Sequence, residues 1–151
     1  MSEHPFQVVI LAGGLGTRLR TVAPDTPKSL VPVAGRPFIE HQFDLLRRAG
    51  LTRVLLGVGH LGGQIEAHVG DGARFGLRVS YSREEPGRLL GTGGALIRAW
   101  PLLDDAFLTL YGDSYLPTDY GAVVRAFARA GCLALMTVFR NVGRWDQSNA
   151  R

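Results

Sequence analysis

Residues 6–14 read FQVVILAGG, an unbroken apolar run that ends at two glycines. Such a run, continuous rather than alternating, predicts a strand that is buried on both faces, as in a parallel sheet. Residues 53–58 (RVLLGV) repeat this pattern. Further strands are expected at 77–82, 106–111 and 132–139, so the chain carries five predicted strands.

Apolar residues at helical spacing separate these runs. They predict helices over 38–49, 61–69, 93–100 and 119–130, the last with Asp119 as its N-cap. Alternating strands and helices predict an α/β fold with a Rossmann-like, doubly wound and mostly parallel sheet and helices on both faces. Because no linker or repeat interrupts the 151 residues, we expect a single domain.

The composition narrows the class of protein. The net charge is +4, but no basic face interleaved with aromatic residues is evident, so nucleic acid is not an expected partner. No apolar run approaches the ~18 residues of a membrane span, and the first residues do not resemble a signal peptide. The lone Cys132 excludes an internal disulfide and is expected to be a buried thiol. These features predict a cytoplasmic protein.

The loop after the first strand has the composition of an anion-binding loop. Gly13, Gly14 and Gly16 would let backbone N–H groups approach an anion, and Arg18 would neutralise it. The glycine spacing matches neither the dinucleotide-binding fingerprint nor the Walker A loop. The alternative is a tight turn with a surface arginine.

Lys28 is the only lysine beside 16 arginines. A lysine ammonium is a compact point charge on a flexible stem, whereas the arginine guanidinium is a planar fork, so the two are not interchangeable. Pro27 and Pro32 would constrain the loop that presents Lys28. A phosphate ligand is therefore expected for Lys28, and a solvated loop lysine is the alternative.

Two later segments also follow predicted strands. Asp113, in Gly-Asp-Ser after the fourth strand, is a candidate Mg²⁺ ligand, although Asp is also common in turns. Residues 90–95 (LGTGGA) would offer the N-terminus of a helix to a phosphate or a base, and Glu85 would accept hydrogen bonds from a base or remain solvated. The carboxyl ends of parallel strands share one edge, so these segments should line one crevice.

Four segments resemble the sugar-1-phosphate nucleotidyltransferase (nucleotide-sugar pyrophosphorylase) family: LAGGLGTRL at 11–19, PKSLVPVAGRPFIEH at 27–41, LGTGGAL at 90–96 and LYGDSY at 110–115. Within that family, LGTGGAL, YGDSYLPTDY and MTVFRN are most similar to D-glycero-D-manno-heptose 1-phosphate guanylyltransferases, followed by mannose-1-phosphate guanylyltransferases.

From the residues and the resemblance together, the expected catalytic residues are Arg18, Lys28 and Asp113, with Asp113 as the Mg²⁺ ligand. The resemblance implies that Lys28 and Asn149 bind the sugar phosphate, although Ala150 stands where the family more often has valine. The residues expected to bind the nucleotide are Leu11, Ala12, Gly13, Gly14, Gly16, Thr17, Arg18, Glu85, Gly91 and Thr92.

The resemblance implies a Mg²⁺-dependent reaction of an NTP, with GTP expected, and a sugar 1-phosphate, with release of pyrophosphate. It leaves room for a homo-oligomer. Family members continue into strands that supply a second lysine and a second Mg²⁺-binding aspartate, and neither follows Arg151. A truncated gene product or a fragment is therefore expected, and a non-catalytic module that binds nucleotide or sugar phosphate is the alternative function.

Overall fold

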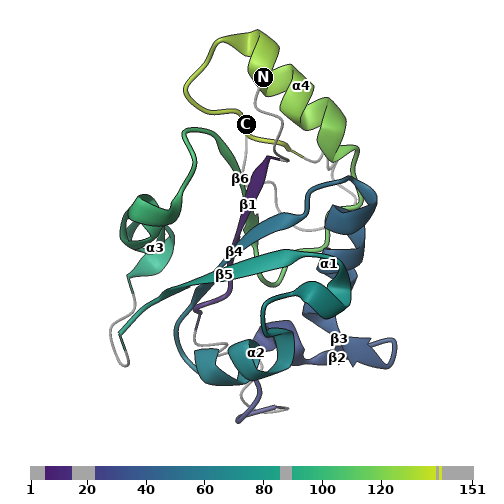
Figure 1. Ribbon diagram of the computed structural model, residues 1–151, viewed down its shortest axis with the longest axis vertical. Coiled ribbons are helices and arrows are strands. Elements are labelled where there is room, and N and C mark those ends of the chain that lie inside the picture. Colours follow the sequence, from purple (N-terminus) through teal and green to yellow (C-terminus); the bar gives the residue numbers. More distant parts are fainter. Residues whose placement is uncertain (1–5, 15–22, 86–89, 139, 141–151) are drawn as a thin grey trace. The chain divides into compact units, whose positions relative to one another are not determined.

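The computed structural model describes residues 6–14, 23–85, 90–138 and 140. These residues fall into two compact units, Met1–Pro117 and Thr118–Arg151, and each is considered by itself. The first unit contains the sheet and the loops that follow its strands (Figure 1). It is therefore the unit that bears on function.

One four-stranded parallel sheet, in the order β5-β4-β1-β6, organises the described part of the first unit. Its strands are β1 (Gln7–Leu11), β4 (Arg53–Val58), β5 (Arg78–Arg83) and β6 (Phe107–Tyr111). The chain runs outward from β1 through β4 to β5 and then returns to place β6 on the other side of β1. The predicted α/β class with a parallel sheet is confirmed, and so are the first four predicted strands.

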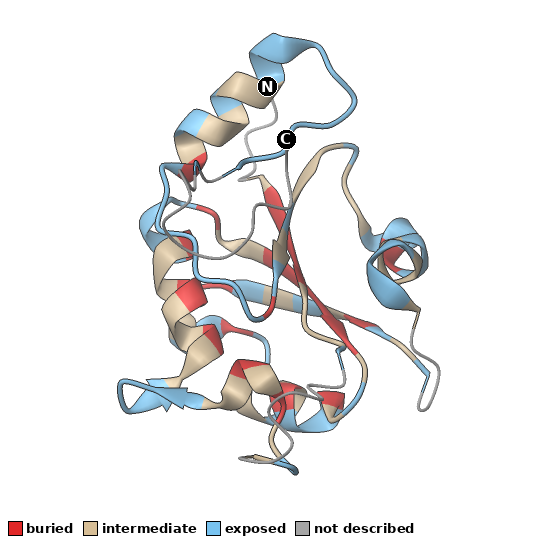
Figure 2. Cartoon of the chain, turned by 180° about the vertical axis from the view of Figure 1, so that it is seen from behind, coloured by how far each residue is buried: buried red, intermediate tan, exposed pale blue. Residues whose placement is uncertain are grey.

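The centre of the sheet is buried, as the unbroken apolar run of the first strand predicted. Val8, Val9 and Ile10 of β1 have no exposed surface, and the neighbouring strand β4 is buried from Val54 to Val58 (Figure 2). Burying an aliphatic side chain of this size contributes about 2 kcal/mol. β1 therefore combines a ladder on both edges with burial on both faces, and it fixes the positions of the loops that follow its neighbours.

Helices cover both faces of the sheet (Figure 1). On one side lie α1 (Phe38–Arg48) and α2 (Gly62–Val69), and on the other lies α3 (Gly91–Ala99). Ala99 of α3 packs against Val9 and Leu55, which belong to neighbouring strands. Successive side chains of a strand point to opposite faces, so the alternate residues of β1 are available to the opposite helical layer. The doubly wound arrangement is thus confirmed.

A small hairpin between the first strand and α1 was not predicted. It pairs β2 (Pro32–Val33) with β3 (Arg36–Pro37) through Ala34 and Gly35, whose φ angles are +48° and +79°. Two successive residues with positive φ are typical of the tight two-residue turns that connect the strands of a hairpin. The hairpin follows the one-turn 3₁₀ helix η2 (Lys28–Leu30), which carries the single lysine.

In the second unit, α4 (Tyr120–Ala130) begins where it was predicted, since the Ala122 N–H donates to Asp119 Oδ1 at 2.9 Å. The fifth strand predicted at 132–139 is wrong over its described residues, 132–138, which form no ladder. Leu133 and Met136 are exposed, and so is Cys132, which was expected to be buried. An apolar run becomes a strand only when a neighbouring strand pairs with its backbone, and none does so in this described stretch.

No helix in the described ranges is long and apolar enough to cross a membrane.

Candidate active site

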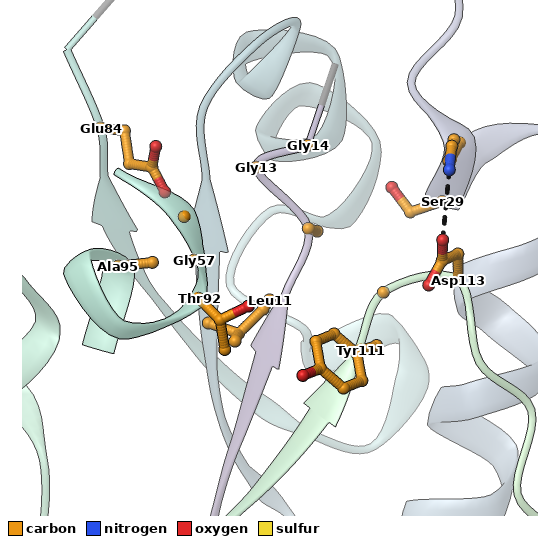
Figure 3. Close-up of a pocket in the computed structure, with 14 residues that line it drawn as sticks. Leu11, Gly13, Gly14, Ser29, Gly57, Glu84, Thr92, Ala95, Tyr111 and Asp113 are labelled. Atoms are coloured by element: carbon orange, nitrogen blue, oxygen red, sulfur yellow. Dashed lines mark hydrogen bonds and ion pairs between the residues drawn. The ribbon is translucent and has the colours of Figure 1, made fainter. Parts of the chain in front are cut away.

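The loops after β1, β5 and β6 meet around one cavity of about 260 Å³ (Figure 3). It lies beyond the carboxyl ends of β1 and β6, where the strand order reverses direction, which is the usual ligand site of open α/β sheets. The residues that line it are Leu11, Ala12, Gly13, Gly14, Lys28, Ser29, Gly57, Glu84, Gly91, Thr92, Ala95, Tyr111, Gly112 and Asp113.

Most of the described candidates lie in this cavity. The structure brings together Leu11, Ala12, Gly13, Gly14, Lys28, Gly91, Thr92 and Asp113. Four other candidates, Gly16, Thr17, Arg18 and Asn149, lie outside the described residues. The three segments that were expected to share a crevice therefore do share one, over the parts that are described.

Glu84, rather than the predicted Glu85, is the glutamate that lines the cavity. The Glu84 N–H donates to Val58 O at 2.8 Å and so extends the pairing of β5 with β4 by one residue. Along an extended backbone, neighbouring side chains point to opposite sides. Glu85 is exposed instead, with its carboxylate 3.8 Å from Arg98 Nη1. The prediction chose Glu85, whereas the adjacent Glu84 lines the cavity.

The Glu84 carboxylate is held between two backbone segments. Its Oε2 accepts the Leu90 N–H at 3.3 Å, just before α3 begins. Its Oε1 lies 3.1 Å from the position that a Cβ on Gly13 would take, so the carboxylate rests against the bare backbone of the first loop. A negative charge is thus fixed at one end of the cavity, with oxygen lone pairs left for a ligand.

The N-terminus of α3 faces the same end of the cavity. Gly91, with φ of +66°, turns the chain into the helix, a conformation that favours glycine. Thr92 and Ala95 are three residues apart, so one face of the first turn lines the cavity (Figure 3). The first N–H groups of a helix have no partner inside the helix and attract acceptor groups of a ligand.

Lys28 and Asp113 form an ion pair at the other end of the cavity. Lys28 Nζ lies 3.2 Å from Asp113 Oδ2, although the two residues are 85 positions apart (Figure 3). The Lys28 side chain is 26% exposed and that of Asp113 is 54% exposed. Exposed ion pairs contribute at most about 1 kcal/mol to stability, so this pair matters for the chemistry that it offers to a ligand.

The loop that presents Lys28 is rigid for a local reason. Pro27 precedes the one-turn helix η2, whose Leu30 N–H donates to Pro27 O at 2.8 Å. Ser29 is 2% exposed and anchors the turn in the interior, while its neighbour Lys28 reaches the cavity. The constrained presentation that the prolines predicted is therefore present at Pro27.

Close packing at the end of β6 explains Gly112. A Cβ at this position would lie 2.9 Å from Leu11 O and 3.0 Å from Ala12 Cα. The Gly112 N–H donates to Leu11 O at 2.9 Å, so the turn that carries Asp113 lies directly against the end of β1. Only a residue without a side chain permits this approach.

Sequence reasoning missed several residues of the wall. Glu84 is adjacent to the candidate Glu85, and the choice between them depended on where the pairing of β5 ends. Gly57 is the penultimate residue of the buried strand β4 beside β1, and a glycine at this position was a signal that went unused. Ser29, Ala95 and Tyr111 carried no distinguishing signal, because a serine, an alanine and a tyrosine at such positions are most often structural.

Asp113 fits Mg²⁺ as one ligand among several. In proteins this ion is usually held by one or two carboxylates together with phosphate oxygens and water, and Asp113 offers one exposed carboxylate in the cavity. Across the part of the chain that is described, no group of three or more His, Cys, Asp or Glu side chains could hold a metal. Asp113 would therefore bind Mg²⁺ only together with phosphate oxygens or further ligands.

Fold and cavity together define an α/β protein with a charged cleft at the switch point of its sheet. Residues 7–145 match the nucleotidyl transferase family, and the chain belongs to this family. Its relatives are sugar-1-phosphate nucleotidyltransferases, which confirms the resemblance deduced from the sequence motifs.

The relatives use different nucleotides. D-glycero-alpha-D-manno-heptose 1-phosphate guanylyltransferase of Campylobacter jejuni is 35% identical over 86% of this chain and 57% of its own length. UTP--glucose-1-phosphate uridylyltransferase of Synechocystis sp. is 33% identical over 85% of this chain and 36% of its own length. The crystal structure of HddC from Yersinia pseudotuberculosis complexed with GMP-PN has a TM-score of 0.71 and 34% identity, covering 80% of this chain and 53% of that one.

The chain thus spans about a third to somewhat more than half of the length of these relatives.

Proposed function

We propose that this chain carries the nucleotide-binding part of a Mg²⁺-dependent nucleotidyltransferase that joins GTP to a heptose- or mannose-type sugar 1-phosphate. The observation that carries the proposal is the polarity of the cavity. Glu84 lies at one end, the Lys28–Asp113 pair lies at the other, and the loop at Gly13 and Gly14 runs between them (Figure 3). A nucleotide has the same polarity, with a base at one end and phosphates at the other.

Guanine is the base that best complements Glu84. An ionised carboxylate only accepts hydrogen bonds, and guanine presents two adjacent donors, its ring N–H and its exocyclic amine. Uracil and thymine present one ring N–H flanked by two carbonyl oxygens. A carboxylate would repel these oxygens, because both groups only accept hydrogen bonds. The N-terminus of α3, beside Glu84, adds backbone donors for the acceptor atoms of the base.

The triphosphate would follow the first loop toward Lys28. Among the described residues, no atom beyond the chain neighbours of Gly14 lies within 4 Å of a Cβ built there, so these residues leave its backbone open to a ligand. Lys28 would neutralise phosphate oxygens, and we assign the same task to Arg18, which precedes it in the sequence. Mg²⁺ held by Asp113 and the phosphates would reduce the negative charge on the reacting phosphates.

The reaction follows from this arrangement. A phosphate oxygen of the sugar 1-phosphate attacks the α-phosphorus of GTP, and the bond to the departing pyrophosphate breaks in line with the attack. Such a step needs alignment and charge neutralisation more than covalent help. Lys28 and Asn149 would bind the sugar phosphate, and the remaining contacts would come from the part of the family domain that this chain does not span.

A second candidate is a binding module without turnover. It is favoured by the single carboxylate that the described cavity wall offers near Lys28, namely Asp113. The two candidates share the nucleotide site and differ only in whether pyrophosphate is released.

Pyrophosphate release separates the two candidates. The protein is incubated with GTP, CTP, UTP, dTTP or ATP, each combined with heptose, mannose, glucose or N-acetylglucosamine 1-phosphate and Mg²⁺. We expect release with GTP and a heptose or mannose 1-phosphate, and much less with the other pairs. GTP binding without release from any pair would establish the module instead, and failure to bind any nucleotide would refute both.

Glu84→Gln should weaken the preference for GTP over UTP, measured as a ratio of dissociation constants, by about 10- to 100-fold. Glutamine keeps an oxygen that can accept the Leu90 N–H, but it replaces one acceptor by a donor and so fits uracil better than a carboxylate does. Glu85→Gln is the matched control, since Glu85 is exposed outside the cavity, and it should leave the ratio unchanged. Equal ratios for wild type and Glu84→Gln would show that Glu84 does not contact the base.

We further propose a cytoplasmic location, as expected for an enzyme of nucleotide-sugar synthesis, and association into a homo-oligomer.

A further inference from the structure

We infer that Gln42 of α1 is a positioning residue that holds the turn bearing Asp113 in the geometry needed for metal binding. This inference rests on the proposed function only in that Asp113 is taken as the metal ligand. Gln42 Nε2 donates to Tyr111 O at 2.8 Å and to Ser114 O at 2.7 Å. These two carbonyls bracket Asp113, so one buried amide group fixes both ends of its turn.

The orientation of the Gln42 amide follows from its partners. Both partners are carbonyl oxygens, which only accept hydrogen bonds, so the amide nitrogen must face them. Gln42 is 2% exposed, and its buried Oε1 has no hydrogen-bond partner among the residues that the structure describes. An unsatisfied buried acceptor costs folding free energy, whereas an apolar side chain of the same shape would avoid that cost. The two hydrogen bonds from the amide nitrogen to the turn offset this cost.

Besides Gln42, the turn is held on one side of Asp113 by the Gly112 N–H, which donates to Leu11 O at 2.9 Å. The Asp113 side chain is 54% exposed, and within the described part of the chain it contacts Lys28 through the ion pair. Ser114 N–H closes the turn by donating to Tyr111 O at 3.2 Å, a long bond that Gln42 reinforces at the same acceptor. Without the amide, the carboxylate would sample more positions, and a metal ligand must be held closely to bind well.

α1 also positions the other half of the ion pair. The helix packs against η2, the turn that carries Lys28. One helix therefore contacts both the lysine turn and, through Gln42, the aspartate turn. The helix therefore sets the spacing between the ammonium and the carboxylate at this end of the cavity.

Gln7 provides a matched control at the opposite end of the sheet. It is 5% exposed, its Nε2 donates to Leu102 O at 2.9 Å, and its Oε1 accepts the Asp104 N–H at 2.9 Å. Gln7 begins β1, whereas the cavity lies beyond the end of that strand. Gln42→Met and Gln7→Met thus each remove two hydrogen bonds of a buried glutamine, but only the first concerns the Asp113 turn.

The experiment measures Mn²⁺ binding, without turnover, to protein saturated with a non-hydrolysable GTP analogue, and amide hydrogen exchange over 112–114. We expect Gln42→Met to raise the Mn²⁺ dissociation constant about 10-fold and to speed exchange in the turn, while Gln7→Met changes neither. Gln42→Asn keeps an amide on a shorter side chain that does not reach both carbonyls, so this variant should behave like Gln42→Met. If Gln42→Met does not fold, Gln42→Asn takes its place.

Two outcomes would overturn the inference. Unchanged Mn²⁺ binding in the Gln42 variants would do so, and so would an equal loss in Gln7→Met, which would mark a general effect of destabilisation. The proposed function fails differently, since Asp113→Asn would then leave Mn²⁺ binding unaltered. In that case, faster exchange over 112–114 in Gln42→Met but not in Gln7→Met would still show that Gln42 holds the turn, without a role in metal binding.

Discussion

Asp113→Asn is expected to lower pyrophosphate release about 1,000-fold and to abolish the dependence of nucleotide binding on Mg²⁺. A loss of this size corresponds to about 4 kcal/mol of transition-state stabilisation, which is within the range that metal-ion catalysis supplies. The amide of asparagine has nearly the shape of the carboxylate but no charge. It can still accept a hydrogen bond from Lys28, so the turn should be preserved while the affinity for a divalent cation is lost.

Asp105→Asn is the control for this change. Asp105 is exposed and precedes β6, whereas Asp113 follows that strand, so the same chemical change is made at the end of the strand remote from the cavity. The Asp105 variant should retain both rate and Mg²⁺ titration. A wild-type titration curve for Asp113→Asn would remove Asp113 from the metal site.

Lys28→Arg is expected to lower turnover about 100-fold even though it keeps the positive charge. Lys28 Nζ reaches Asp113 from a constrained turn beside the buried Ser29, and its side chain is only 26% exposed. A guanidinium is larger, planar and donates as a fork, so it cannot replace a compact ammonium on a phosphate oxygen without displacing the turn. The readouts are the rate of pyrophosphate release and the dissociation constant for GTP.

The reverse substitution, arginine to lysine at a surface position, tests whether any exchange between these two residue types lowers turnover. Arg78 is exposed on β5, at the start of the strand, and Arg78→Lys should leave turnover within twofold of wild type. Near-normal rates for Lys28→Arg would show that the single lysine is incidental to the reaction.

The sheet could be predicted because β1 and β4 are continuous apolar runs buried on both faces, β5 alternates and β6 is a short apolar run, and all four strands are observed. The strand predicted at 132–139 had the same kind of composition, yet Leu133 and Met136 are exposed in the structure. Composition records the tendency of a segment to be extended, but pairing depends on a neighbouring strand that the segment itself does not encode. The β2–β3 hairpin escaped notice for the opposite reason, since two-residue strands leave no periodicity to detect.

The site was predicted to the extent that chain topology determines it. Glycines and acidic residues that follow parallel strands must meet at one edge, and Gly13, Gly91 and Asp113 do line one cavity. The choice between Glu84 and Glu85 depended on where the alternation of β5 ends, which the sequence alone does not fix. The contact between Lys28 and Asp113 joins residues 85 positions apart and required the structure.

The Lys28–Asp113 ion pair affects how a nucleotide and a divalent cation can bind to the free protein. In the free protein each group is the counter-ion of the other, so neither an anion nor a cation alone meets an unopposed charge there. A nucleotide that brings its own divalent cation offers a phosphate for the lysine and a cation for the aspartate at the same moment. We therefore expect the pair to exchange partners in one concerted event and to select the metal–nucleotide complex over either component by itself.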